Sequence, residues 1–112
     1  MSAIDPVDLA ARLISVPSVT PARGAVFDVL DEALSALGFT VHRFVQGEAP
    51  DGPTENMVAI RERGPGPHVG FAGHLDVVPA GEGWAEDAFS ARIADGRLIG
   101  RGANDMKSAI AA

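Results

Sequence analysis

The chain has 112 residues, 46% of them hydrophobic, and a net charge of −6 from 15 acidic and nine basic residues. This length suits one globular domain with a small core. The acidic balance argues against a nucleic-acid partner, because binding to phosphates depends on clustered Lys and Arg. The absence of cysteine excludes disulfides, thiolate nucleophiles and Cys-bound zinc, so a transition metal would have to be held by His and carboxylates.

The N-terminus has the features of neither a secretory signal nor a membrane anchor. Asp5 and Asp8 fall where a signal peptide carries its basic region. No apolar run approaches the roughly 20 residues that a membrane helix needs. We therefore expect a cytoplasmic protein with no membrane partner.

Two helices are predicted in the first third of the chain. Asp5 can cap a helix over residues 6–15, whose first residue is a proline, a type favoured at that position. The proline-rich residues 16–21 then require extended backbone. Apolar side chains at helical spacing predict a second helix over residues 22–37, and Gly38 is the expected stop.

Strands are predicted next. Alternating polarity indicates a strand over residues 39–45, followed by a loop over residues 46–55. Two apolar runs, 56–62 and 68–73, are joined by Arg-Gly-Pro-Gly-Pro, which is too short for a helical crossover, so we expect an antiparallel hairpin. The second run is almost wholly apolar, which is typical of a strand covered on both faces. His74 follows it directly, at the sheet edge where ligand sites of α/β folds lie.

The last third begins with an irregular segment over residues 75–90. Its only tryptophan, Trp84, is expected to pack over a core edge rather than line a site. An Asp-Gly turn predicts a short hairpin within residues 91–99. Asn104 is expected to cap a third helix over residues 105–112.

These elements predict an α/β fold in which helices pack on a mixed, partly antiparallel sheet. The last helix has an apolar face without a partner and no stop signal. We therefore expect residues 1–112 to be the N-terminal part of a single catalytic domain that is incomplete at its C-terminus.

Three residues are candidates for a metal site. In extended backbone His74 and Asp76 point to the same side, so Asp76 can accept a hydrogen bond from one ring nitrogen of His74. The other nitrogen then becomes a better metal ligand. Asp105, at a helix start after a Gly-rich loop, can reach the same point and bridge two cations. Two metal ions about 3.5–4 Å apart polarise a carbonyl oxygen and supply a hydroxide, and amide hydrolysis needs both.

Each of these patterns has a structural alternative. A lone His at a strand end, such as His74, is more often a hydrogen-bonded structural residue than a ligand. Asp105 can simply complement the helix dipole. His42 and His68 are each expected to be a surface or hydrogen-bonded residue, and the Ser18 hydroxyl is expected in a loop hydrogen bond. A dinucleotide site at the Gly-Arg-Gly loop is disfavoured, because its third glycine position is Asp105.

Two long motifs closely resemble the di-zinc aminoacylase and carboxypeptidase family. They are Gly-His-Leu-Asp-Val-Val-Pro at residues 73–79 and Gly-Arg-Gly-Ala-Asn-Asp-Met-Lys at residues 100–107. Trp84 and Phe89 lie between them, and the Pro-Ser-Val-Thr-Pro segment at residues 17–21 also matches. The resemblance therefore extends over nearly the whole chain.

The resemblance implies a zinc-exopeptidase-like domain that hydrolyses the amide bond of a small N-acyl amino acid. It implies that His74 ligates one Zn²⁺, that Asp76 orients His74, and that Asp105 bridges two Zn²⁺ ions, which Co²⁺ can replace. The general base, the other ligands and a domain that forms a homodimer would lie further along. Ala88 replaces a usual proline and Ser108 a common glycine, which affects loop shape more than chemistry.

The exact substrate stays open at this point. Acetylornithine deacetylase, aminoacylases and carboxypeptidases share the two motifs, so the motifs alone do not choose among them. A different class of interpretation also stays open, in which the 112 residues are a non-catalytic structural unit.

Overall fold

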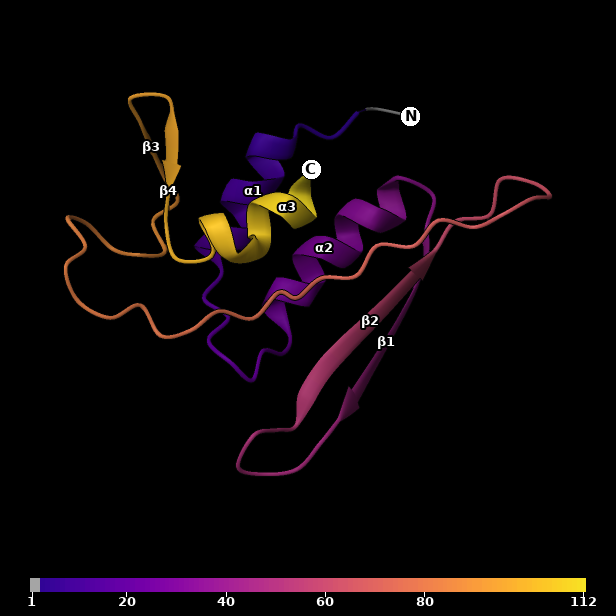
Figure 1. Cartoon of the computed structure of the whole chain (residues 1–112), viewed down its shortest axis with the longest axis horizontal. Coiled ribbons are helices and arrows are strands. Elements are labelled where there is room, and N and C mark those ends of the chain that lie inside the picture. Colours follow the sequence, from indigo (N-terminus) through magenta and orange to yellow (C-terminus); the bar gives the residue numbers. More distant parts are fainter. Residues whose placement is uncertain (1–2) are drawn as a thin grey trace.

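The computed structural model describes residues 3–112 and contains helices and two small antiparallel sheets (Figure 1). The helices are α1 (Pro6–Ser15), α2 (Ala25–Ala36) and α3 (Ser108–Ala111), the last preceded by the wide turn η1 (Ala103–Lys107). The strands are β1 (Thr40–Gln46), β2 (Thr54–Ile60), β3 (Arg92–Ala94) and β4 (Arg97–Ile99). The predicted α/β class is confirmed, and so is the Asp-Gly hairpin, which forms β3 and β4.

The first two helices follow from local sequence with one correction. Asp5 caps α1, because its Oδ1 accepts a hydrogen bond from the backbone N–H of Val7 at 2.8 Å. Helix α2 begins at Ala25 and not at residue 22, because Gly24 has a φ of 76°, outside the helical region. Gly38 ends α2 as predicted, with a φ of 89°.

The predicted pairing of residues 56–62 with residues 68–73 is wrong. Strand β2 pairs with β1 instead, so the loop predicted over residues 46–55 ends where β2 begins. Residues 68–73 belong to no strand, and Phe71 is 98% exposed. A strand covered on both faces needs neighbouring strands and a packed layer on each face. The described residues supply neither beside this segment.

The β1–β2 hairpin is fastened to α2 by Arg43 on β1. Its Nε donates to Glu55 Oε2 at 2.6 Å and its Nη1 to Asp28 Oδ1 at 2.7 Å. The other oxygen of Glu55 accepts the Gly24 N–H at 2.7 Å. The hydrogen bond between Arg43 and Glu55 is the main reason that the pKa of Arg43 is raised and that of Glu55 lowered. This network joins the two strands, α2 and Gly24, and it includes neither His74 nor Asp105.

The core lies between α1, α2 and the segment after His74. Its buried members are Leu9, Leu13, Ala22, Val26, Phe27, Ala33 and Leu75. The radius of gyration, 15.1 Å over Cα atoms, exceeds the roughly 13 Å of a compact domain of this length. Figure 1 shows the reason, since the β1–β2 hairpin and the chain that follows it extend away from the helices. None of the described helices is long and apolar enough to span a membrane.

The third helix begins later than predicted. Asn104 makes no side-chain capping bond, and α3 starts at Ser108. Asp105 has extended backbone, with φ −127° and ψ 92°. The wide turn starts at Gly102, whose φ is 91°, and is closed by a 2.8 Å bond from the Lys107 N–H to the Gly102 carbonyl. This turn takes up the residues that were expected to form the first helical turn.

Candidate metal centre

His74 and Asp76 lie on either side of Leu75 in an extended segment. Leu75 and Val77 are buried, whereas the side chains of His74 and Asp76 are 46% and 38% exposed. The Val77 N–H donates to the Ser18 carbonyl at 3.0 Å, which ties the segment to the connection between α1 and α2. The predicted alternation is therefore confirmed, with the two polar side chains on the open side.

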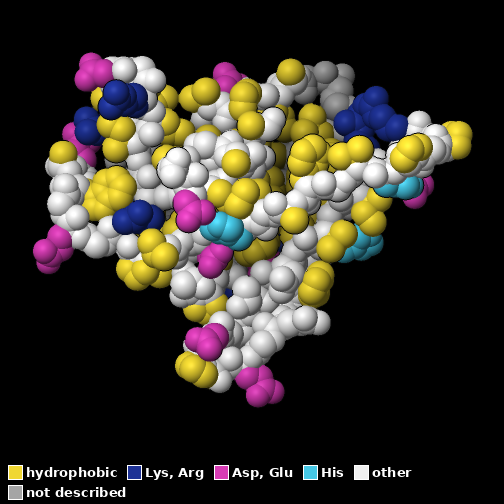
Figure 2. Space-filling view, viewed as in Figure 1, with side chains coloured by type: hydrophobic (Ala, Val, Ile, Leu, Met, Phe, Trp, Pro, Cys, Tyr) yellow, Lys and Arg dark blue, Asp and Glu magenta, His cyan; other side chains and the backbone are white. Residues whose placement is uncertain are grey.

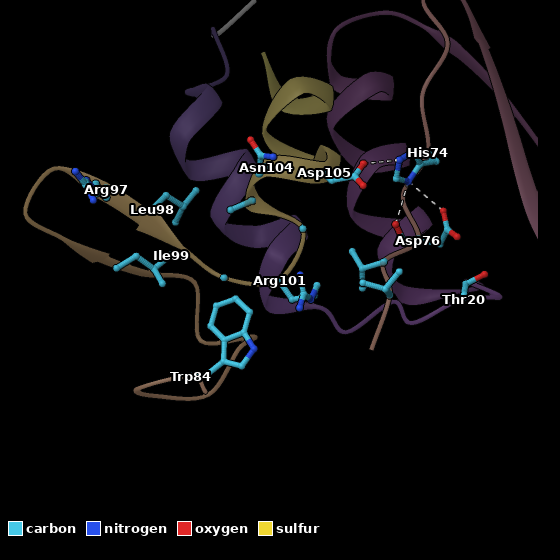
Figure 3. A pocket seen from close by; sticks show the side chains of 15 residues that line it. Thr20, His74, Asp76, Trp84, Arg97, Leu98, Ile99, Arg101, Asn104 and Asp105 are labelled. Carbon is cyan, nitrogen blue, oxygen red and sulfur yellow. Dashed lines mark hydrogen bonds and ion pairs between the residues drawn. The ribbon is translucent and has the colours of Figure 1, made fainter. Parts of the chain in front are cut away.

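His74 contacts both acidic residues. Its Nδ1 lies 3.0 Å from the backbone oxygen of Asp76 and 3.1 Å from Asp76 Oδ1. Its Nε2 lies 2.9 Å from Oδ1 of Asp105, as Figure 3 shows. In Figure 2 a histidine lies between acidic side chains near the middle of the visible face. The structure thus brings together all three residues that the sequence singled out.

The electrostatics of this cluster favour a cation between His74 and Asp105. Burial lowers the pKa of His74, but hydrogen bonds and negative charge from Asp76 and Asp105 outweigh burial and leave the pKa raised. When the Nδ1–H donates to Asp76, the lone pair on Nε2 faces the Asp105 carboxylate. A proton on Nε2 removes that repulsion, and a metal cation at the same place would do so too.

Asp105 reaches His74 because the turn that carries it packs against the chain around residue 73. The backbone N–H of His74 donates a weak bond to Met106 Sδ at 3.4 Å. A Cβ at Gly73 would lie 3.1 Å from Met106 Cε. A side chain at position 73 would therefore require the ends of the Met106 and Ile110 side chains to shift.

A cavity of about 470 Å³ opens beside the three residues (Figure 3). Trp84 Nε1 and Arg101 Nη2 both donate to the Ala80 carbonyl, at 2.8 Å and 2.9 Å. The Arg101 guanidinium carbon is 5.3 Å from the centre of the Trp84 ring. Trp84 therefore forms the cavity wall and lies outside the hydrophobic core cluster, contrary to the packing role favoured from sequence.

Two further polar residues support the site. The Ser18 hydroxyl is used in a loop hydrogen bond, as predicted, and donates to the Leu75 carbonyl at 2.7 Å. The sequence did not predict the burial of Lys107, which has 0% exposure and donates from Nζ to the carbonyls of Leu13 and Val16. Lysine is rarely buried, and only the position of α1 creates this environment. His42 and His68 are exposed, as predicted.

The described residues contain no complete metal site. Within residues 3–112, no group of three or more His, Cys, Asp or Glu side chains is placed to hold a metal ion. His74 Nε2 and the Asp105 carboxylate provide two possible metal donors. Asp76 contacts the other ring nitrogen of His74, Nδ1.

Comparison with known proteins defines the class of protein. Residues 70–112 match peptidase family M20/M25/M40, and this region contains His74, Asp76 and Asp105. The chain belongs to this family.

Three similar curated relatives carry the same enzyme name. The chain is 66% identical over 110 residues to succinyl-diaminopimelate desuccinylase of Sphingopyxis alaskensis, covering 97% of the chain and 29% of the relative. It is 60% identical over 113 residues to the enzyme of the same name from Novosphingobium aromaticivorans, covering 100% of the chain and 30% of the relative. It is 50% identical over 107 residues to the enzyme of the same name from Rhodospirillum rubrum, covering 96% of the chain and 27% of the relative. The chain therefore spans less than a third of the length of these relatives.

Proposed function

We propose that the chain is the N-terminal part of a single catalytic domain of a succinyl-diaminopimelate desuccinylase. The complete enzyme would hydrolyse N-succinyl-L,L-2,6-diaminopimelate to succinate and L,L-diaminopimelate, a reaction of lysine biosynthesis. We expect it to be a cytoplasmic homodimer. The observation that carries the proposal is the convergence of His74 and Asp105 at 2.9 Å in a chain with 50–66% identity to enzymes of that name.

The donor set fits a transition metal. Members of this family are metal-dependent, and an imidazole nitrogen with a carboxylate oxygen suits Zn²⁺ or Co²⁺. Two zinc ligands with bonds of about 2.0–2.2 Å in tetrahedral geometry stand roughly 3.3 Å apart. The 2.9 Å between His74 Nε2 and Asp105 Oδ1 needs only a small side-chain adjustment. The complete enzyme would hold two Zn²⁺ ions, with the other ligands outside residues 3–112.

Each of the three residues has a distinct role in this proposal. Asp76 accepts the Nδ1–H of His74 and fixes the tautomer that leaves Nε2 free to bind a metal. His74 would hold one metal ion, and the exposed carboxylate of Asp105 would be shared by both. Bound metal would polarise the amide carbonyl and lower the pKa of the attacking water. The cavity beside them offers space for a small N-acyl amino acid.

The substrate assignment is tested on the complete protein. Steady-state kinetics with N-succinyl-L,L-diaminopimelate and with N-acetylornithine should give the higher kcat/KM for the succinyl substrate. A higher kcat/KM for acetylornithine would assign the protein to the deacetylase that shares its motifs.

The site assignment is tested by substitution. His74→Ala and Asp105→Ala should each lower bound zinc and reduce kcat by more than about 100-fold, because even loss of a residue behind a ligand costs roughly 10–100-fold. His42→Ala is the matched control, since His42 is exposed on β1. Wild-type zinc content and kcat in either site variant would remove that residue from the site.

The 112-residue chain by itself should bind zinc weakly. Two donors cannot complete two metal sites. Titration of the chain with Zn²⁺ by calorimetry should therefore show weak binding at most. Tight binding of two Zn²⁺ per chain would contradict the proposed division of ligands between this segment and the rest of the enzyme.

A further inference from the structure

The connection between α1 and α2 (residues 16–24) contacts both halves of the metal site. On one side, Ser18 is 5% exposed and its hydroxyl donates to the Leu75 carbonyl at 2.7 Å. The backbone of the connection also pairs with Val77, since the Thr20 N–H donates to the Val77 carbonyl at 3.0 Å. These bonds hold the residues directly next to His74 and Asp76.

On the other side, Lys107 fastens the turn that carries Asp105. The Nζ of Lys107 donates to the carbonyls of Leu13 at 2.7 Å and Val16 at 3.1 Å. Both carbonyls lie at the C-terminal end of α1, where backbone oxygens lack helical partners and a positive charge is favourable. Lys107 follows Asp105 by two residues, so this contact fixes the end of the turn.

The two attachments also touch each other. Gly102 is buried with a φ of 91°, and a Cβ there would lie 2.8 Å from Val77 Cγ1 and 3.1 Å from Lys107 Cδ. The Asp105 turn therefore packs directly on the segment that carries Asp76. Movement of one attachment relative to the other would therefore alter the distance between His74 and Asp105.

The burial of a charged amine indicates a role beyond filling space. An ammonium group loses hydration when it is buried, and an apolar side chain of the same length would fill the volume without that loss. What lysine adds is two directed hydrogen bonds, one to Leu13 in α1 and one to Val16 directly after it, and these hold the turn against the end of the helix.

We propose that Ser18 and Lys107 are positioning residues, which attach the His74 segment and the Asp105 turn to the C-terminal end of α1 and the connection that follows it, and thereby set the spacing of the metal ligands. The proposal rests on the proposed function, because the spacing has a purpose only if His74 and Asp105 bind metal. Neither residue lines the cavity beside His74 and Asp105.

The test compares Lys107→Met and Ser18→Ala with Arg43→Met in the complete protein. Met keeps the length of the lysine stem, and Arg43→Met breaks a partly exposed network of ion pairs among β1, β2 and α2 that contains none of the three candidate site residues. For the first two variants we expect Zn²⁺ affinity, measured by chelator competition, to fall about 10–100-fold, with a lower kcat and an unchanged KM. Arg43→Met should lower the melting temperature and leave Zn²⁺ affinity at the wild-type value.

A second readout requires neither metal nor substrate. In the metal-free protein at fixed pH, the ring ¹⁵N shifts of His74 report its bond to Asp105. We expect Lys107→Met and Ser18→Ala to move these shifts towards those of Asp105→Ala, whereas Ser18→Thr, which keeps the hydroxyl, should retain the wild-type shifts. If Lys107→Met does not fold, Ser18→Ala and Ser18→Thr carry the test.

The outcomes separate this proposal from the proposed function. Wild-type ring shifts in folded Ser18→Ala and Lys107→Met overturn the positioning role, even if the enzyme is confirmed as a desuccinylase. An equal loss of Zn²⁺ affinity in Arg43→Met also overturns it, because the effect would then be one of general stability. A different outcome is that the complete protein shows the expected changes in the His74 ring ¹⁵N shifts while it neither binds zinc nor cleaves the substrate. That result would support the positioning role and overturn the proposed function.

Discussion

The residues before and after His74 are equally apolar, yet they have opposite environments. Before His74, Val69 and Phe71 are 83% and 98% exposed, whereas after it Leu75 and Val77 are 6% and 4% exposed. The later residues hydrogen-bond to the connection between α1 and α2 and face the core. The earlier ones belong to no strand. Burial is therefore decided by available backbone partners and a facing apolar layer, and not by hydrophobicity alone.

The largest effect on stability should come from the buried half of this segment, which is the part after His74. Leu75→Ala removes a member of the core cluster, and it should lower the free energy of unfolding by about 2–5 kcal/mol through lost burial and a residual cavity. Denaturant unfolding of the chain gives the value. A loss below about 0.5 kcal/mol, the scale of surface changes, would mean that this half is no better packed than the exposed one.

The pH dependence of stability should report the buried attachment at Lys107. Burial lowers the pKa of Lys107 from its ordinary 10.5 to about 8. Between these values the folded chain has released the proton and the unfolded chain still holds it, so stability rises with pH. One pKa unit corresponds to about 1.4 kcal/mol, and the interval from pH 7.5 to pH 10.5 captures most of the difference between the two pKa values, so the rise is about 3 kcal/mol. Denaturant unfolding at pH 7.5 and pH 10.5 measures it.

Lys107→Met is the control for that measurement. Its unfolding free energy should lack this contribution over the same interval, because no amine remains at the position. A rise of equal size in wild type and Lys107→Met would assign the pH effect to other groups.

A smaller effect, on Zn²⁺ affinity, is expected at Asp76, which lies in the buried segment after His74. Asp76→Asn keeps the size of the side chain but removes the charge that faces His74 Nδ1 at 3.1 Å. The Zn²⁺ affinity of the complete protein should fall about 10–100-fold. Asp51→Asn is the control, since Asp51 is exposed in the loop between β1 and β2. Equal affinities for the two variants would mean that Asp76 does not orient His74.

The smallest effect should come from the exposed half. Phe71→Ala in the 112-residue chain should change the free energy of unfolding by no more than about 0.5 kcal/mol, because the ring has almost no contacts to lose. A loss above about 2 kcal/mol, typical of a buried aromatic residue, would show that this segment is covered in solution. The contrast across His74 would then disappear.

Local elements were predictable because their signals are local. The Asp5 cap, the Gly38 stop and the Asp-Gly hairpin each depend on a few neighbouring residues. Gly24 shows the limit, because its positive φ, outside the helical region, delays the start of α2 until Ala25. The pairing of β1 with β2 was missed for a related reason, since a strand partner is chosen by the geometry of the whole hairpin.

For the site, the sequence by itself singled out His74, Asp76 and Asp105 as the candidate residues. The residue order alone shows that His74 and Asp76 alternate along the chain and that a Gly-rich loop precedes Asp105. The structure brings the three residues together. Only the tertiary structure decided how they are held. Lys107 and Ser18 act across distances of 94 and 57 residues in the chain, and such contacts exist only after α1 and the connection have packed. Residue order specifies local geometry, whereas the burial of a lysine depends on what folds over it.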